Sequence, residues 1–543
     1  MKKTALLSLV LMASAALQAQ AQSEPPADMQ TPDYSAFILT PDAPETPRIN
    51  GPKIYGARPG SDFLFKIPAT GARPMKFTAE GLPKGLRLDE TTGIITGKVK
   101  KAGTYQVSLK AENHLGSYER GFRIVIGEDK IALTPPMGWN SWNCWGNTVS
   151  QDKVLASARA IEESGLANYG WSYINIDDGW QGIRGGEYNA IQPNKKFPDM
   201  KELADSLHSM GFKIGIYSGP WVGTYAAHIG TQCDNADGKY DWVEKGLVDE
   251  NYRLNDPSGN LRRENHWYSG KYSFAAQDAR QWAEWGIDYL KYDWAPHDWY
   301  SIKEMHDELR KQRHDIVYSL SNSARLPLAD EYVKLANCWR TTGDIRDNWK
   351  NFSGIAFGRH SGWAPYAGPG HWPDADMLVI GNVGWGRKYH YTELTPDEQY
   401  THISYWAMAA SPLLIGCDMA LADKFTISLL CNSEVIDINQ DVLGYAATRI
   451  YGDNTYATYF KPLEDGCIAI AMFNLSTAPK TIGFVPRSIG IVGDCTIRDV
   501  WRQKDITTIG DKERWEVEVA PHGVMLVKLK PGFSKDKPEG SYR

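Results

Sequence analysis

A short stretch in the middle of the chain places a lysine and an aspartate where they could act together. Residues 289–296 read Tyr-Leu-Lys-Tyr-Asp-Trp-Ala-Pro, a pattern typical of a short buried strand. Side chains two residues apart on a strand point to the same face, so Lys291 and Asp293 are expected to emerge side by side. A neighbouring ammonium lowers the pKa of a carboxyl group and would keep Asp293 ionised and able to act as a nucleophile. The alternative interpretation is a structural ion pair at the end of a strand.

Eight short apolar runs alternate with amphipathic helical patterns between Leu133 and Asp418, which predicts a (β/α)8 barrel. In such a barrel the chemistry lies at the C-terminal ends of the strands. We expect the strands at 138–142, 173–177, 213–218, 289–293, 316–321, 338–342, 376–380 and 413–417.

Six of the predicted strands carry polar motifs at or beside their ends. Each motif alone has an ordinary structural explanation, such as a helix cap or a turn. Six motifs in barrel order instead indicate one site, and two carboxylates that flank one site suggest glycoside hydrolysis. The residues concerned are Trp142, Asp177, Asp178, Tyr217, Lys291, Asp293, Arg340, Asp344 and Asp376.

So many aspartates could also bind a metal ion. Zinc hydrolases use histidine ligands, and the sequence has no His-Glu-x-x-His or His-x-His motif and no histidine at these strand ends. A calcium site stays open, but it would not explain Lys291 and Arg340. We therefore expect no metal, and a carbohydrate as the partner.

The composition limits the class of protein. The 543 residues carry a formal net charge of -6 without a basic patch, so nucleic acid is not an expected partner. The 20 tryptophans and 28 tyrosines are weak support for carbohydrate binding, although aromatic cores explain many of them. The 7 cysteines are irregularly spaced; some could pair after export, and the odd number leaves at least one free thiol.

The first residues are typical of a secretory signal peptide. Lys2 and Lys3 precede an apolar run that is too short to span a membrane, and Ala19-Gln20-Ala21 offers a cleavage site. We therefore expect an exported chain without a membrane span, in the periplasm or outside the cell. The sequence does not predict the oligomeric state.

Shifts in composition divide the rest of the chain. Runs of β-forming residues between Gly and Pro turns dominate before Gly127 and again after Val435. The predicted fold is α/β, a (β/α)8 barrel preceded by a small Ig-like β-sandwich and followed by an antiparallel β-sandwich. We expect a signal peptide at 1–21, a linker or mobile tail at 22–47, the Ig-like module at 48–128, the catalytic barrel at 129–430 and the C-terminal β domain at 431–535.

Five motifs together resemble those of glycoside hydrolase family 27, the α-galactosidase and α-N-acetylgalactosaminidase family. The likeness runs from about Leu133 to Leu529, and its motifs are long and ordered. Residues 81–105 separately resemble a bacterial immunoglobulin-like module that is often attached to exported enzymes. The five motifs are PPMGWNSW at 135–142, IDDGW at 176–180, LKYD at 290–293, WRTTGDIRDNW at 339–349 and VIDINQD at 435–441.

The resemblance implies a retaining, exo-acting enzyme that releases terminal α-linked D-galactose from oligo- or polysaccharides. Asp293 would be the nucleophile and Asp344 the acid/base, so Asp344 has to hold its proton while Asp293 is ionised. Asp177 and Asp178 would accept hydrogen bonds from O4 and O6 of the sugar and so select an axial 4-hydroxyl. Trp142 would pack against the ring, and the polar wall would be completed by Tyr217, Lys291, Arg340 and Asp376. No cofactor would be needed.

The loop after the predicted fifth strand departs from the α-galactosidase pattern. Members of that class tend to carry Glu or Cys there, with a bulky residue nearby. This chain has Ser321 and Ala324, which match the small pair with which α-N-acetylgalactosaminidases admit a 2-acetamido group. An α-galactosidase whose pocket is filled from elsewhere and an α-N-acetylgalactosaminidase both remain open. So does a β-L-arabinopyranosidase, because that sugar shares the ring stereochemistry without carbon 6.

A non-enzymatic alternative is a sugar-binding protein with an inactive barrel, although the intact Asp293 and Asp344 argue against it. A second departure from the family is the segment Trp221–Phe274, which is far longer than an ordinary connection. It has to leave the barrel at the catalytic face, so it is either a lid that shapes the aglycone side or a subdomain with its own aromatic core. The family's cysteine after the nucleophile is replaced by Trp294-Ala295, which leaves Cys233 without an obvious partner.

Overall fold

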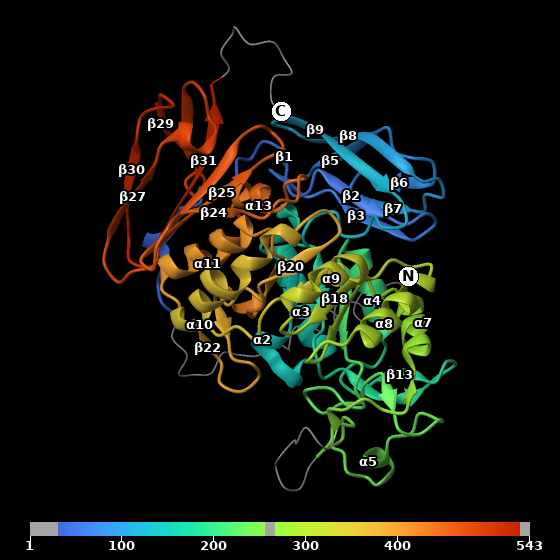
Figure 1. Cartoon of the computed structure of the whole chain (residues 1–543). Coiled ribbons are helices and arrows are strands. Elements are labelled where there is room, and N and C mark those ends of the chain that lie inside the picture. Colours follow the sequence, from blue (N-terminus) through green and yellow to red (C-terminus); the bar gives the residue numbers. More distant parts are fainter. Residues whose placement is uncertain (1–30, 256–265, 533–543) are drawn as a thin grey trace, which may run out of the picture.

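Eight parallel strands form one curled sheet in the middle of the computed structural model, which describes residues 31–255 and 266–532 (Figure 1). All eight strands consist of buried residues, as expected for a parallel sheet covered on both sides. In sheet order they are β20 (Trp372–Asp374), β19 (Cys338–Arg340), β18 (Val317–Ser321), β17 (Tyr289–Asp293), β14 (Lys213–Ser218), β11 (Tyr173–Asn175), β10 (Met137–Asn140) and β23 (Leu413–Ile415).

A parallel bridge between Leu378, which follows β20, and Ile415 of β23 closes the sheet. The predicted barrel is thereby confirmed. The register aligns the polar ends, since Asp293 lies opposite Ser321 and Arg340 lies opposite Asp374. The ends of neighbouring strands therefore meet at one rim.

The predicted seventh strand at 376–380 is wrong. The strand is β20, which ends at Asp374, and the chain turns at Asp376 with a φ of 89°. The apolar run after Asp376 looked like a strand. Pro373 is tolerated in β20 because that strand has a fully bonded neighbour only on its β19 side.

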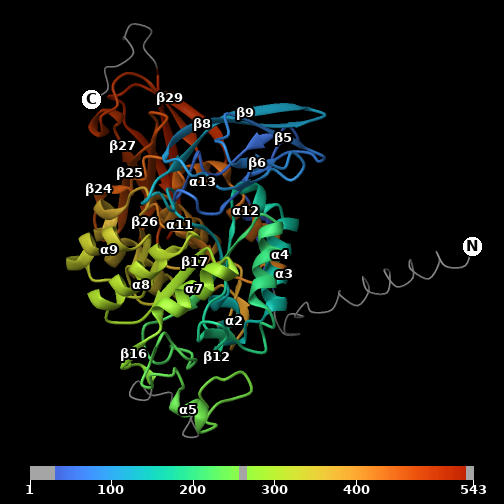
Figure 2. The ribbon, with the colours of Figure 1, turned by 90° about the vertical axis from the view of Figure 1, so that its right-hand side faces the viewer.

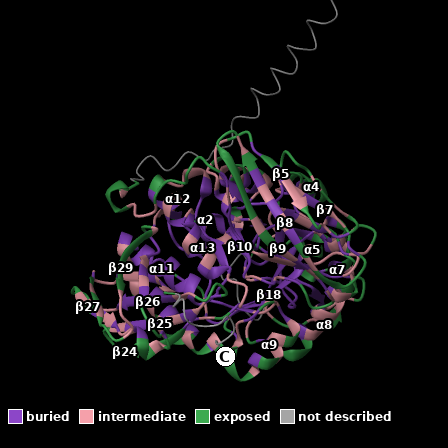
Figure 3. Ribbon diagram, turned by 90° about the horizontal axis from the view of Figure 1, so that it is seen from above, coloured by how far each residue is buried: buried purple, intermediate pink, exposed green. Residues whose placement is uncertain are grey.

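Helices surround the barrel, and one of them is buried on nearly all sides. This is α11 (Pro396–Met408), which lies between the barrel and the C-terminal domain (Figure 3). It therefore has almost no exposed face, and polar residues such as Glu398 and His402 are buried in it as well. The others are α2 (Trp142–Trp145), α3 (Gln151–Glu163), α4 (Met200–Ser209), α5 (Asp241–Glu244), α7 (Ala275–Trp285), α8 (Trp299–Lys311), α9 (Ala329–Leu335), α10 (Trp349–Ser353), α12 (Lys424–Leu430) and α13 (Ser433–Asn439). Short antiparallel pairs are formed by β12 (Gln181–Gly185) with β13 (Ala190–Pro193), β15 (Gln232–Cys233) with β16 (Tyr272–Ser273), and β21 (Asn382–Val383) with β22 (His390–Tyr391).

The Ig-like domain packs on the N-terminal ends of the barrel strands, at the opposite end of the molecule from α5 (Figures 1 and 2). Buried Arg58 joins the two domains, because its backbone N–H and its guanidinium bind Asp315 and its guanidinium also donates to the carbonyl groups of Arg310, Gln312 and His314. Its strands are β1 (Arg48–Ile49) with β4 (Ala69–Thr70), the sheet β2 (Ile54–Ala57), β9 (Gly116–Ile126), β8 (Gly103–Asn113) and β5 (Lys76–Glu80), and the sheet β3 (Phe63–Lys66), β7 (Ile94–Gly97) and β6 (Leu86–Leu88).

The C-terminal domain has its own apolar core between two antiparallel sheets, as predicted. The larger sheet has the order β24 (Thr448–Gly452), β25 (Tyr456–Pro462), β26 (Ile468–Asn474), β31 (Val524–Pro531), β28 (Cys495–Asp499) and β29 (Lys504–Ile509), and the smaller pairs β27 (Lys480–Phe484) with β30 (Trp515–Val519).

The predicted signal peptide lies outside the described residues. Part of the predicted linker is anchored instead of free. The ring of Tyr34 packs edge-on against Phe425, and Tyr400 donates a hydrogen bond to the carbonyl of Phe37 and accepts one from the N–H of Leu39. Within residues 31–255 and 266–532 no helix is long and apolar enough to cross a membrane.

Candidate active site

A cavity of about 200 Å³ opens at the C-terminal ends of the barrel strands. All but two of the residues predicted from the sequence line it, so the fold brings together side chains from six βα units. The predicted residues in its wall are Trp142, Asp177, Asp178, Tyr217, Lys291, Asp293, Arg340, Asp344 and Asp376.

Asp293 stands at the end of β17 with both carboxylate oxygens in contact with donors. Tyr217 donates to Oδ2 at 3.1 Å, and the amide of Asn322 lies 3.4 Å from Oδ1. Burial raises the pKa of Asp293 to about 6, although Lys291 acts in the opposite direction. The expectation that Lys291 would hold this pKa low is therefore wrong, because desolvation outweighs the ammonium.

Lys291 lies in the same wall, but its hydrogen bond goes elsewhere. Its Nζ donates to Oδ2 of Asp177 at 2.7 Å. The backbone N–H of Asp177 in turn donates to the hydroxyl of Ser141 at 2.9 Å. Asp177 is thus fixed by neighbours on two strands, with Lys291 as its counter-ion.

Arg340, at the end of β19, binds two carboxylates. Its guanidinium lies 2.9 Å from Asp376 and 3.1 Å from Asp344. Burial alone would raise the pKa of Asp344, but Arg340 and Lys291 outweigh it and hold the pKa below its usual value. The side chain of Asp344 is 51% exposed, whereas that of Asp376 is 4% exposed and also accepts the N–H of Ile345.

The order of the two pKa values is the reverse of the one that the resemblance implies. The pKa of Asp293 is raised because it is buried, and that of Asp344 is lowered because it sits beside Arg340.

Asp178 is held by the long segment that follows β14. The hydroxyl of Thr224 donates to one carboxylate oxygen at 2.9 Å, and the N–H of Ala226 donates to the other at 2.7 Å. Tyr225, between these two residues, lines the cavity. Burial nevertheless raises the pKa of Asp178 to about 7.

The segment Trp221–Phe274 therefore both shapes the site and has its own aromatic contacts. Tyr225 packs edge-on between Trp221 and Trp267. The indole N–H of Trp267 donates to the carbonyl of Thr224 at 2.9 Å, which supports the residue that binds Asp178. Residues 256–265 of the segment lie outside the described part.

Ser321 and Ala324 stand beside the cavity and do not line it. The hydroxyl of Ser321 accepts a hydrogen bond from Arg340 at 3.3 Å, and Ala324 belongs to the apolar core. Asn322, between them in the chain, faces the cavity instead. The sequence analysis missed the lining residues Asn143, Tyr225, Asn322 and Met377.

The polar side chains that line the cavity are carboxylates, one lysine, one arginine, tyrosines and asparagines. The described part of the chain holds no group of three or more His, Cys, Asp or Glu side chains in a metal-binding arrangement. All seven cysteines are free thiols in this structure, and Cys233 contacts the carbonyl of Lys239.

Comparisons with known proteins agree with this geometry. The family model described as alpha galactosidase A matches residues 134–246 and 259–441, a model of the alpha galactosidase C-terminal β-sandwich matches 453–529, and an Ig domain model matches 46–127. An α-galactosidase from Cyamopsis tetragonoloba is 32% identical over 75% of this chain and 89% of its own length.

Two solved structures are similar over nearly their whole length. A candidate α-galactosidase/melibiase from Bacteroides fragilis has a TM-score of 0.77 and 35% identity over 91% of this chain and 99% of its own. A family 27 β-L-arabinopyranosidase from Geobacillus stearothermophilus has a TM-score of 0.64 and 28% identity over 76% and 99%. The chain described here belongs to glycoside hydrolase family 27, the α-galactosidase family.

Proposed function

We propose that this protein is a retaining, exo-acting α-galactosidase that releases terminal α-linked D-galactose from oligo- or polysaccharides. The observation that carries the proposal is that Asp293 and Asp344 face one cavity lined by carboxylates and cations. A cavity of about 200 Å³ has room for one sugar ring, which supports removal of a terminal residue. The α-galactosidase relative supports galactose as that residue.

In the proposed mechanism Asp293 attacks the anomeric carbon while the bond to the leaving oxygen breaks. Asp344 gives its proton to that oxygen, and the sugar is left bonded to Asp293. Asp344 then takes a proton from water, which attacks the same carbon and releases Asp293. The hydrogen bond from Tyr217 holds the Asp293 carboxylate in position for both steps.

Substrate binding supplies the proton shift that this mechanism needs. The sugar would cover the exposed side chain of Asp344, and loss of water favours its neutral form. The leaving oxygen would accept the hydrogen bond of protonated Asp344. Both effects move the shared proton from Asp293 to Asp344, so the two carboxyl groups act as one titrating pair.

We assign recognition of the sugar to the part of the cavity wall that contains Asp177 and Asp178. Asp177 and Asp178 would accept hydrogen bonds from O4 and O6, and both are fixed by donors behind them. Trp142 would pack against the ring. Arg340 and Asp376 would complete the wall and position Asp344.

Two other sugars remain candidates within this family. The match to a β-L-arabinopyranosidase favours a ring without carbon 6. The small residues Ser321 and Ala324 favour a 2-acetamido sugar, although in this structure the loop lines the cavity with Asn322 and not with these two residues. We also propose export to the periplasm or the exterior, supported by the composition of residues 1–21.

The test is a parallel assay of aryl α-galactoside, aryl α-N-acetylgalactosaminide and aryl β-L-arabinopyranoside. We expect kcat/KM to be highest for the α-galactoside, and Asp293→Asn to abolish its turnover. The matched control is Asp298→Asn, because an Asn can still cap α8 at that position and lies outside the cavity wall. Galactose binding without cleavage of any of the three substrates would refute the enzymatic proposal.

A further inference from the structure

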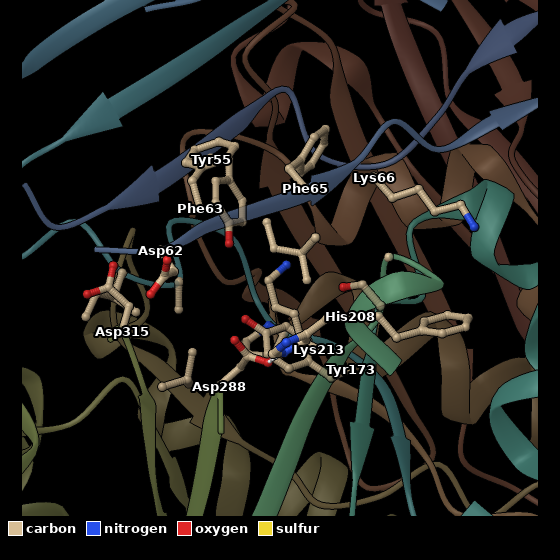
Figure 4. A pocket seen from close by; sticks show the side chains of 18 of the residues that line it. Tyr55, Asp62, Phe63, Phe65, Lys66, Tyr173, His208, Lys213, Asp288 and Asp315 are labelled. Carbon is tan, nitrogen blue, oxygen red and sulfur yellow. Dashed lines mark hydrogen bonds and ion pairs between the residues drawn. The ribbon is translucent and has the colours of Figure 1, made fainter. Parts of the chain in front are cut away.

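A second and larger cavity, of about 590 Å³, lies at the other end of the barrel (Figure 4). Strands β2 and β3 of the Ig-like domain form one side, and the first residues of β11, β14 and β18 form the other. Its volume is in the range of small-molecule sites, which typically measure about 300–1,000 Å³. Neither the proposed catalytic residues nor the sugar wall takes part in it.

The carboxylates of this cavity already have cationic partners. Asp288, for example, lies 2.8 Å from His208 and 3.1 Å from His314, and His314 also faces Asp62. A cation added to the cavity would therefore meet carboxylates that are already neutralised. The carboxylates in its wall, all paired with Lys, Arg or His, are Asp62, Asp205, Glu284, Asp288 and Asp315.

Lys213 is a cation in this wall without such a partner. It is the first residue of β14, and only 6% of its surface is exposed. Its Nζ lies 4.8 Å from the ring centre of Tyr55 and 5.2 Å from that of Tyr173. Across residues 31–255 and 266–532, no acceptor lies within hydrogen-bonding distance of this ammonium. The two rings hold it in place and leave its N–H groups available.

The two tyrosines add neutral donors. In the described part of the chain, neither the Tyr55 nor the Tyr173 hydroxyl has a hydrogen-bond partner. Burial raises the pKa of both, so both stay protonated and can donate. In Figure 4 Tyr55 reaches into the cavity from the Ig-like domain, and Lys213 and Tyr173 reach into it from the barrel.

We propose that this cavity binds a small carboxylate of sugar-acid size, whose carboxylate accepts hydrogen bonds from Lys213, Tyr55 and Tyr173. Among the buried residues of this wall, Lys213 is the cation without an acidic partner, and with two neutral donors it matches a single negative charge. A phosphate dianion would exceed the available positive charge beside carboxylates such as Asp288. The aromatic residues Phe63 and Phe65, which also line the cavity, offer apolar contact to the rest of the ligand. Because the donors come from two domains, the bound ligand would also stabilise the junction between them.

The experiment is calorimetric titration of the full-length protein with sodium D-galacturonate. The comparison titrations use D-galactose, sodium phosphate and sodium chloride. The test variant is Lys213→Met. The matched control is Lys66→Met, because Lys66 lines the same cavity but already binds the carbonyl of Met210.

We expect saturable galacturonate binding to the wild type and to Lys66→Met, with a loss of at least tenfold in affinity for Lys213→Met. Lys213→Met should still hydrolyse aryl α-galactoside, which reports a folded barrel. If Lys213→Met does not fold, Tyr55→Phe replaces it and should weaken binding by a smaller factor. Equal affinity in wild type and variant, phosphate binding tighter than galacturonate, or complete displacement of galacturonate by galactose would each overturn the proposal.

Discussion

The ammonium of Lys291 lies 2.7 Å from Oδ2 of Asp177, a carboxylate that follows a strand two places away in the barrel. Lys291 shares β17 with Asp293, yet its hydrogen bond is made to the opposite wall. It therefore neutralises Asp177 directly and acts on Asp293 only through the electrostatic field. This single cation couples the proposed sugar wall to the proposed nucleophile.

Replacing Lys291 by Met should impair both the proposed binding of the sugar by Asp177 and the proposed nucleophile Asp293. Asp177 would be left buried without its counter-ion, and removal of one partner of such a pair costs about 3–5 kcal/mol. We expect kcat/KM for aryl α-galactoside to fall by about 10²-fold or more, at 1.4 kcal/mol per tenfold. Lys201→Met is the control, since Lys201 is exposed on α4. A variant with normal kcat/KM would contradict this role.

The pH dependence of kcat/KM follows from the shared proton. At low pH both carboxyl groups are protonated and no nucleophile is present; at high pH both are ionised and no acid is present. Of the two ionisations, the one at higher pH is that of Asp293, whose pKa is about 6 in the free protein. We expect kcat/KM to decline above about pH 6 in the wild type, and the decline to start at higher pH in Lys291→Met, because loss of the cation raises that pKa. Initial rates between pH 4 and 8 would measure this dependence of kcat/KM. A kcat/KM that stays constant up to pH 8 would refute the assignment of this ionisation to Asp293.

Thr224 should act on the substrate through Asp178. Thr224→Val removes the hydroxyl that donates to Asp178 and leaves a buried carboxylate oxygen unpaired, at about 1–3 kcal/mol. We expect kcat/KM for the α-galactoside to fall about 10-fold or more, while Thr224→Ser, which keeps the hydroxyl, stays near the wild type. If Val and Ser behave alike, the hydrogen bond to Asp178 does not matter for turnover.

The buried pair of Arg58 and Asp315 should contribute more to stability than the exposed pair of Arg123 and Glu464, which also joins two domains. The side chain of Arg58 is 7% exposed and that of Asp315 is 14% exposed, so Arg58→Met leaves a nearly buried carboxylate without its counter-ion. The backbone N–H of residue 58 and the hydroxyl of Ser61 stay as its donors. We expect a loss of about 3–5 kcal/mol in the free energy of unfolding of the junction. Arg123→Met, which breaks a 35% exposed pair with Glu464, should cost about 0–1 kcal/mol. Thermal unfolding of both variants decides between the two values.

The barrel and most of the proposed site could be predicted because their signals are local. The alternation of apolar runs and helices gives the strand order, and the C-terminal ends of strands converge in any such barrel. Lys291 and Asp293 share a face because of strand periodicity alone. The prediction of the seventh strand was wrong because the apolar run at 376–380 is visible in the sequence, whereas the pairing of Trp372 with Cys338 is not.

The remaining features depend on contacts between distant segments. Nothing near Thr224 or Tyr225 in the chain indicates that this segment folds back onto Asp178. The low pKa of Asp344 depends on the guanidinium of Arg340 turning toward it, and the high pKa of Asp293 depends on burial by several strands. The cavity around Lys213 lies between two domains, and neither domain sequence indicates it.

The most direct test of the central claim is the anomeric form of the first product. Proton NMR during the first minutes of aryl α-galactoside hydrolysis should show α-galactose first, with the β form growing in later by mutarotation, because two displacements at Asp293 retain the configuration. β-Galactose as the first product would mean a single displacement by water and would contradict the assignment of Asp293 as the nucleophile.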